Sequence, residues 1–301
     1  ATGNGSSIEF NNQASSFNAL AVSATDGVTF NADVFASSGS LSINADADSD
    51  ENASDNNGTL TVASSVTVTA SGNLSIIAND LVSEGNLDAS GFEILIQDSD
   101  GSGVVMGNQF IGGWLNLSQT ELDGMAADAM TISSNARINV YGVTLPNPGD
   151  PDSFSGAMTL DSGTYVLFYS SESTFASLTV EADDLVYVGA NLSTTTGDLI
   201  LRSDVDGTPD FYDKIYFEAN VVVDSAGELL LDASGGSETF GAIDLLAADG
   251  VTINQSFTGT GKVKIDADTD SDANTSDDSG TLTIASGATL ATNGNALEIR
   301  L

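Results

Sequence analysis

The sequence predicts an all-β fold, and within that class a parallel β-helix (a β-solenoid) with aspartate-rich loops inserted between its strands. Short apolar runs alternate with Ser and Thr, which is typical of strands that bury one face. Gly, Asn, Asp and Ser separate these runs at intervals of about six to ten residues. The chain also repeats itself over long distances, and a solenoid is built from such repeats.

The internal repeat is clearest between residues 39–62 and residues 261–284, which match through an acidic loop and the strands on both sides. The match extends upstream, where residues 17–30 correspond to residues 240–253. A β-sandwich, the alternative all-β architecture, does not need such repetition, whereas a solenoid does. The expected repeat copies lie near 17–77, 175–233 and 240–301, with a weaker copy near 74–110.

The strands in each copy have the two-residue period that a solenoid interior requires. Leu41 and Ile43, for example, alternate with Ser. One turn of the coil is expected to take about 20–22 residues, with three short strands joined by three turns. We expect a single continuous solenoid over residues 1–301, with a projecting loop near 145–153, where three of the four prolines lie.

Composition limits the partners of the chain. Lys and Arg number 6 against 43 Asp and Glu, a net charge of −37, while 41% of the residues are hydrophobic. The apolar residues suffice for a core, so the charge is expected on its surface. A field this negative repels nucleic acid and anionic membrane surfaces and attracts cations. Because no apolar run is long enough to cross a bilayer as a helix, we expect neither a nucleic-acid partner nor membrane insertion.

The acidic loops carry the candidate site. Their aspartates alternate, and in a turn this spacing lets three carboxylates converge on a hard cation such as calcium, which takes oxygen ligands. Solvated turns that keep a sheet protein soluble are the alternative, but they do not need the ordered spacing that the two long loops share. We therefore predict calcium as a cofactor. Its predicted ligands are Asp46, Asp48, Asp50, Asn52, Asp55, Asp268, Asp270, Asp272, Asn274 and Asp277, with the shorter variants Asp204, Asp206, Asp210, Asp98 and Asp100 as further candidates.

Residues 58–76 and 247–253 resemble the repeats of filamentous-haemagglutinin-like bacterial adhesins and exoproteins. The resemblance rests on strand–turn rhythm and composition, as in the Gly-Thr-Leu-Thr-Val run that begins at Gly58, and it covers most of the chain. It implies a right-handed parallel β-helix. It also implies export to the bacterial cell surface and a role in adhesion or in building extracellular fibres.

The sequence does not predict an enzyme. His is absent, which removes the commonest general base. Lyases of the β-helix shape need a cationic residue, and the six cations of this chain form no cluster in the sequence. Hydrolases need only two carboxylates, but a catalytic site is usually single whereas the acidic loops are alike. The alternative function is a carbohydrate-binding or polysaccharide-degrading β-helix protein.

Two further motifs favour ordinary structural roles. The Thr-x-Thr pairs, such as Thr59 and Thr61, do not recur in every copy as an ice-binding surface would require. Trp114 is expected in the core or at a cap rather than in a sugar-stacking site. Aromatic residues gather between Tyr165 and Phe217, where a partner surface is most expected.

We therefore expect a secreted structural or adhesive repeat protein that forms a calcium-stabilised extracellular rod or filament. The sequence stops at Leu301 within a unit that continues in the first copy. An open solenoid end exposes strand edges and core. The expected partner is therefore a second copy joined end to end, or more of the same repeat chain. A cell-surface or polysaccharide partner also fits the expected role.

Overall fold

Parallel strands dominate the computed structural model. Strands account for 53% of the chain and helix for 2%, and the strands pair in parallel in long sheets. The predicted all-β parallel β-helix is therefore confirmed. The described residues are 5–48, 58–147, 154–208, 212–270 and 280–301.

The chain divides into two compact units. Unit 1 comprises Ala1–Ile138 and Thr144–Met158, and unit 2 comprises Asn139–Val143 and Thr159–Leu301. The strands β15 (Ile138–Tyr141) and β16 (Ala157–Ser162) have residues in both units. The expectation of one continuous solenoid over the whole chain stays a prediction.

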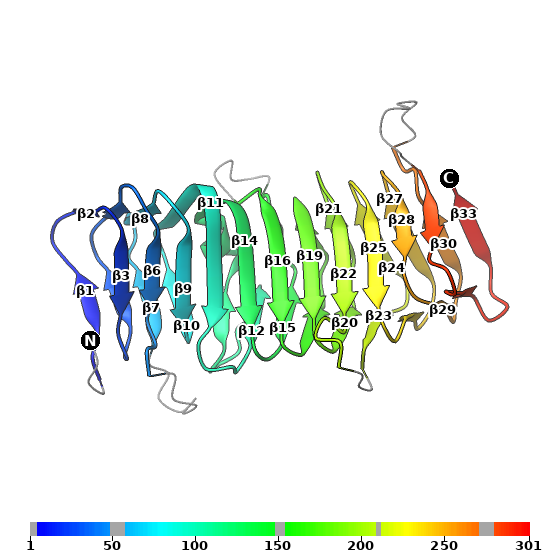
Figure 1. Cartoon of the computed structure of the whole chain (residues 1–301), viewed down its shortest axis with the longest axis horizontal. Helices are drawn as coiled ribbons and strands as arrows, with labels where there is room; N and C mark the ends of the chain where they lie inside the picture. The colour runs from blue at the N-terminus through cyan, green and yellow to red at the C-terminus, as the bar shows by residue number, and fades with distance from the viewer. Residues whose placement is uncertain (1–4, 49–57, 148–153, 209–211, 271–279) are drawn as a thin grey trace. The chain divides into compact units, whose positions relative to one another are not determined.

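In unit 1, each strand pairs with its counterpart one turn of the coil further along. Three ladders run β1–β4–β7–β10, β2–β5–β8 and β3–β6–β9. The long strand β11 pairs with both β8 and β9, so β3, β6, β9 and β11 lie side by side (Figure 1). The bounds are β1 Ile8–Phe10, β2 Ser15–Phe17, β3 Leu20–Ser23, β4 Val28–Phe30, β5 Val34–Ala36, β6 Leu41–Asn44, β7 Thr59–Val62, β8 Thr67–Ala70, β9 Leu74–Ala78, β10 Asp80–Ser83, β11 Asn86–Asp98, β12 Val104–Gly107, β13 Leu115–Leu117, α1 Gln119–Asp123 and β14 Met125–Ser134.

In unit 2, every third strand pairs, which is the pattern of a coil with three strands to a turn. The ladders run β17–β20–β23–β26–β29–β32, β18–β21–β24–β27–β30–β33 and β19–β22–β25–β28–β31. The bounds are β17 Tyr165–Phe168, β18 Ser173–Phe175, β19 Ser177–Ala182, β20 Leu185–Val188, β21 Leu192–Thr194, β22 Leu199–Ser203, β23 Lys214–Phe217, β24 Val221–Ser225, β25 Leu229–Ala233, β26 Ser237–Thr239, β27 Ile243–Ala247, β28 Val251–Ile253, β29 Phe257–Gly259, β30 Val263–Asp266, β31 Leu282–Ile284, β32 Leu290–Ala291 and β33 Leu297–Arg300.

The core of each unit consists of columns of apolar side chains from successive turns. Alternate residues of a strand point to opposite faces, so one face of each strand is apolar and the other is polar. In unit 1, Leu41, Leu74 and Ile94 are paired in register and fully buried. Each such side chain contributes about 1.5–3 kcal/mol by leaving water. The columns therefore fix the register of the ladders, since a slip by one residue would expose a whole column.

The acidic loops lengthen the coil locally without breaking the ladders. Ile8 pairs with Val28 across a short turn of the coil, whereas Leu41 pairs with Leu74 across a turn that includes the first loop. The second copy has the same arrangement, since Val263 pairs with Leu297 across the second loop. The first loop follows β6 and the second follows β30. Both loops are thus additions at the ends of regular strands.

One short helix departs from the expected strand pattern. Ser118 and Glu121 form a capping box at the start of α1: the Ser118 side chain accepts from the Glu121 N–H at 3.3 Å, and the Glu121 carboxylate accepts from the Ser118 N–H at 2.7 Å. The following residues, from Met125, belong to β14. A Ser-x-x-Glu signature was therefore readable in the sequence, but its helix has only five residues.

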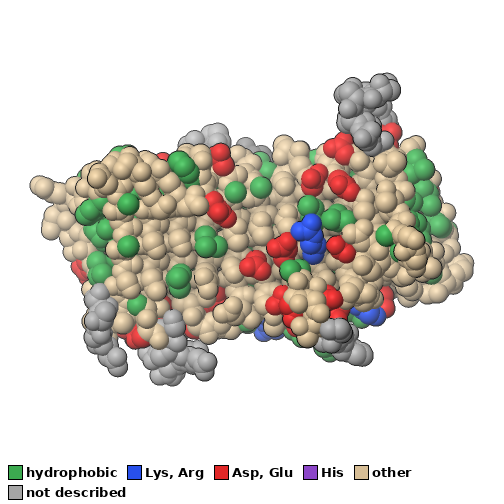
Figure 2. Space-filling model, in the orientation of Figure 1, with side chains coloured by type: hydrophobic (Ala, Val, Ile, Leu, Met, Phe, Trp, Pro, Cys, Tyr) green, Lys and Arg blue, Asp and Glu red, His purple; other side chains and the backbone are tan. Residues whose placement is uncertain are grey.

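Acidic and basic side chains meet on one outer face of unit 2. On the face drawn in Figure 2, acidic side chains gather around basic atoms over the region of β22 in unit 2. One ion pair of this region joins Arg202 to Glu181 at 3.0 Å. Among the described residues, no helix is long and apolar enough to cross a membrane.

Candidate metal centre

The predicted calcium ligands are only partly within the described residues. Asp46, Asp48, Asp98 and Asp100 belong to unit 1, and Asp268 and Asp270 belong to unit 2 together with Asp204 and Asp206. The others lie outside the described residues: Asp50, Asn52, Asp55, Asp210, Asp272, Asn274 and Asp277. Their predicted role stays a prediction.

The first acidic loop begins on a buried aspartate. Asp46 is 6% exposed and follows β6, whose last residue, Asn44, accepts a hydrogen bond from the Asp46 N–H at 3.0 Å. The Asp46 side chain accepts a hydrogen bond from the Ser99 hydroxyl at 2.6 Å. Burial, followed by the nearby carboxyls of Asp48 and Asp100, raises the pKa of Asp46 above its usual value, while the Ser99 bond opposes the rise.

The turn over residues 98–103 supplies the second group of carboxylates. Asp98 is the last residue of β11 and is 1% exposed. Its Oδ2 accepts hydrogen bonds from the Gly103 N–H at 3.0 Å and from the Ser134 hydroxyl of β14 at 2.9 Å. Asp100 Oδ1 accepts from the Ser102 N–H at 2.9 Å. Each aspartate therefore has one oxygen held in place by the turn or by β14.

Three other side-chain oxygens of this turn have no hydrogen-bond partner among the described residues. They are Asp98 Oδ1, Asp100 Oδ2 and Ser102 Oγ, all of them buried. The Asp100 carboxyl lies within hydrogen-bonding reach of Asp98, and burial together with this neighbour raises the pKa of Asp98 to about 7. Two carboxylates so placed repel each other unless a proton or a cation lies between them.

The structure thus brings together two of the predicted sites that are distant in the sequence. Ser99 lies between Asp98 and Asp100 and bonds to Asp46, so the start of the first long loop and the shorter 98–103 turn form one cluster. The repeat pattern had predicted the first long loop and the 98–100 variant as separate sites. It also missed Ser99, Ser102 and Ser134, because serine is common in every strand and turn of this chain.

The second long loop begins in different surroundings. Asp266, the last residue of β30, is buried and lies 3.3 Å from Lys264 and 3.7 Å from Arg300. The equivalent residue of the first copy is the neutral Asn44. Asp268 is half-buried and Asp270 is exposed. Cationic side chains are therefore close to the start of this loop, where the first loop has carboxylates.

The turn after β22 carries a smaller acidic group. Asp204 has a positive φ of 62°, and its Oδ1 is buried without a hydrogen-bond partner in the described part of the chain. Asp206 accepts from the Thr208 N–H at 2.9 Å. Burial, then the charges of Asp206, Asp161 and Asp204, raise the pKa of Asp183. The structure brings the shorter predicted variant near two further aspartates that the sequence did not single out.

No group of three or more acidic side chains in the described ranges is arranged to hold a metal ion. The clusters around Asp98 and Asp204 have the oxygen-rich chemistry that calcium prefers. On the residues described, each would need ligands beyond its carboxylates, such as hydroxyl oxygens, backbone carbonyls and water.

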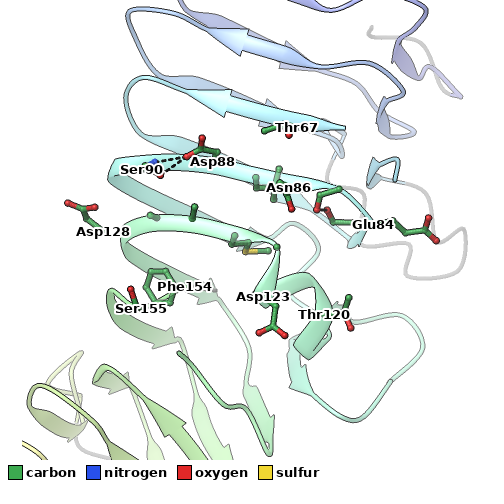
Figure 3. A pocket seen from close by; sticks show the side chains of 17 residues that line it. Thr67, Glu84, Asn86, Asp88, Ser90, Thr120, Asp123, Asp128, Phe154 and Ser155 are labelled. Carbon is green, nitrogen blue, oxygen red and sulfur yellow. Dashed lines mark hydrogen bonds between the residues drawn. The ribbon is translucent and has the colours of Figure 1, made fainter. Parts of the chain in front are cut away.

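Unit 1 also contains an open groove of about 700 Å³. Figure 3 shows Asn86 and Asp88 of β11, Thr120 and Asp123 of α1, and Phe154 around it. Asp88 Oδ1 accepts from the Ser90 hydroxyl at 2.7 Å, and both oxygens of Asp123 accept amide N–H bonds, from Gln119 and Asn147. The groove is polar and acidic.

Trp114 lies in neither site. It is half-buried, and the Arg137 guanidinium lies 4.6 Å from its ring centroid in a cation–π contact. This contact covers part of a ring face that a sugar would need.

Comparisons with models of known protein families, with curated proteins and with solved structures give no match.

Proposed function

We propose that the chain is a secreted structural or adhesive repeat protein that forms a calcium-stabilised extracellular rod or filament. The observation that carries this proposal is that, in unit 1, acidic loops from different turns of the coil (rungs) come close together. The Asp100 carboxyl opposes the negative charge of both Asp46 and Asp98. A cation bound there would remove the repulsion and hold the rungs together, since it would bind the folded chain only.

The test is thermal unfolding of the purified chain with calcium and with a chelator, at low ionic strength. Calcium should raise the unfolding midpoint, whereas magnesium at the same concentration should raise it less, because magnesium dehydrates reluctantly and demands octahedral geometry. An unchanged midpoint in calcium and chelator would contradict the proposal.

Exposed core positions support assembly into a rod or filament. Leu297 and Ile299 of β33 are 44% and 42% exposed, although they pair in register with the fully buried Val263 and Ile265. Ile284 of β31 is exposed in the same way. A further turn of the coil, from a second copy or from more of the same repeat chain, would bury these side chains and pair the open edge of β33. Electron microscopy in calcium should show rods or fibres that shorten or disperse in chelator.

An extracellular site of action and an adhesive role rest on the resemblance to haemagglutinin-like repeats and on the surface charge. Unit 2 adds a candidate contact surface of neighbouring aromatic rings. The ring centroid of Tyr169 lies 5.5 Å from that of Tyr141 and 5.6 Å from that of Tyr187. The Tyr216 ring stacks on the exposed Phe240 ring, with 5.4 Å between their centroids. Adhesion of the chain to host or bacterial surfaces, with and without these rings, tests this part of the proposal.

The groove of unit 1 favours carbohydrate binding as a second candidate function. Its carboxylate, amide and hydroxyl groups match the hydroxyls of a neutral sugar chain, and its volume of about 700 Å³ is that of a small-ligand site. Its acidity disfavours anionic polysaccharides. A glycan array read with the wild-type chain and with Asp88→Ala would test this. Binding that does not depend on Asp88, or no binding at all, would count against the groove.

A further inference from the structure

We propose that the 98–103 turn of unit 1 is a preformed site for one calcium ion, held between Asp98 Oδ1, Asp100 Oδ2 and Ser102 Oγ. The inference rests on the proposed calcium-stabilised rod and locates one ion within it. It assigns the main role to the shorter turn, not to the long loops whose spacing first indicated a metal.

The unpartnered oxygens of the turn carry this proposal. Asp98 is 1% exposed, and its Oδ1 has no donor among the described residues although it lies at the end of a core strand. Buried polar groups are nearly always hydrogen-bonded, so an orphan acceptor needs an explanation. Asp100 Oδ2 and Ser102 Oγ likewise have no partner in the described ranges. Three such oxygen atoms in one turn match the needs of a hard cation.

The turn holds these oxygens in place before any ion binds. The Gly103 N–H and the Ser134 hydroxyl bond to Oδ2 of Asp98, so that Oδ1 is the oxygen left to coordinate an ion. The Ser102 N–H bonds to Oδ1 of Asp100, which leaves Oδ2 for the same purpose. Gly101 and Gly103 have positive φ values of 70° and 121°, which the reversal of the chain requires. Ligands held by surrounding bonds lose less freedom when they coordinate.

The site is also linked to the first long loop. Ser99 lies between the two proposed carboxylate ligands, and its hydroxyl donates to Asp46 at 2.6 Å. Asp46 in turn packs against Gly58, where an added Cβ would lie 2.5 Å from the Asp46 Cβ. An ion at the turn would therefore help to hold both ends of the loop insertion in place, through the Ser99 hydroxyl and the Asp46 side chain.

Only two protein carboxylates take part, so the site is expected to bind calcium at about 10⁻⁴–10⁻³ M, the range of extracellular modules. Water and backbone carbonyls would complete the coordination. At millimolar extracellular calcium such a site is substantially filled, whereas a micromolar cytosolic level would leave it empty.

The test is calcium titration of the full purified chain by calorimetry, after dialysis against chelator at pH 8. The variant Asp98→Asn with Asp100→Asn should bind one calcium fewer per chain than the wild type. Ser134→Ala, which removes a bond that orients Asp98, should keep the number of ions but weaken the affinity of one site about tenfold. The matched control, Asp232→Asn with Asp244→Asn, removes two carboxylates from strands of unit 2 and should change neither quantity.

Thermal unfolding gives a second readout that a merely structural role would not produce. In calcium the Asp98/Asp100 variant should be less stable than the wild type. In chelator it should be more stable, because the buried Asp98 carboxylate and the Asp100 carboxylate that repels it are both gone. The order of the two midpoints should therefore reverse with calcium.

Each outcome decides one claim. If the variant binds as many calcium ions as the wild type, the 98–103 site is wrong, whereas the proposed calcium-stabilised rod is still supported by the ions that bind elsewhere. If the wild type binds no calcium, both proposals fail. If the double variant does not fold, Ser134→Ala and Ser102→Ala decide, and unchanged affinity in both overturns the site.

Discussion

The two long acidic loops have nearly the same sequence but different surroundings. The first begins at Asp46, near the carboxyls of Asp48 and of Asp100, which lies in the turn after β11, two strands along the ladder from β6. The second begins beside the cations Lys264 and Arg300, which approach Asp266 at 3.3 and 3.7 Å. The same motif therefore faces a surplus of negative charge in unit 1 and a partial balance in unit 2.

A repeated motif therefore does not define a repeated site. What a loop can bind depends on the rungs stacked beside it, and those rungs differ between the copies. The demand for a cation is expected to be strongest where the stacked turn adds carboxylates, and weaker where a strand supplies Lys or Arg. Four experiments test how far the two regions differ.

The largest difference in free energy of unfolding is expected between substitutions in β9 and β33, the strands that pair with β6 and β30 after each loop. Ile76 of β9 is fully buried, and Ile299 of β33 holds the equivalent register position but is 42% exposed. Ile76→Ala should lower the free energy of unfolding by about 3 kcal/mol, through lost transfer energy and a cavity. Ile299→Ala should cost under about 1 kcal/mol. Urea unfolding followed by circular dichroism measures both, and equal losses would show that β33 is covered in solution.

In chelator, the Asp98 carboxyl of unit 1 should make the stability of the chain depend on pH. The pKa of Asp98 is raised to about 7 in the folded chain from 3.8, so the folded state binds more protons than the unfolded state between these values. Stability is therefore highest below the unfolded pKa and falls as pH rises towards 7, by on the order of 2 kcal/mol between pH 5 and pH 8. Asp98→Asn should flatten this dependence. A wild-type curve that rises over the same interval would contradict it.

The glycines that close the loops offer a direct comparison. Gly58 and Gly280 have φ values of 88° and 78°, which side-chain-bearing residues rarely adopt. A Cβ would lie 2.5 Å from the Asp46 Cβ at Gly58 and 2.9 Å from the Asp268 Cβ at Gly280. Gly58→Ala should therefore cost about 2 kcal/mol and Gly280→Ala about 1 kcal/mol. Chemical unfolding of the two variants side by side tests the order.

The ion pairs of the second loop should have the smallest effect. Arg300→Gln removes the more distant partner of Asp266; the Arg300 side chain is 61% exposed, and exposed pairs contribute at most about 1 kcal/mol. We expect a loss of about 0.5 kcal/mol in the free energy of unfolding. Calcium binding in unit 2 should become tighter, because one competing positive charge is gone. Unchanged calcium affinity would show that Arg300 does not influence the second loop.

The sequence predicted the fold more fully than the site. The alternation of Leu41 and Ile43 with Ser predicted buried columns, and the repeat between 39–62 and 261–284 predicted equivalent strands, because both depend on local pattern. The partnership of Asp46 with Ser99 depends on which turn is stacked beside which, and spacing along the chain does not encode that. The α1 helix was missed because five residues are too few for a visible helical period.

The register of the ladders has a consequence for how such a chain can change. The chain between β6 and β9 includes the whole first loop, yet Leu41 still meets Leu74 and the column continues undisturbed to Ile94. The pairing of these strands is therefore uncoupled from the length of chain that joins them. A foreign peptide grafted after β6 would be displayed at the edge of the coil, so the solenoid is a scaffold on which new surface features can be added one rung at a time.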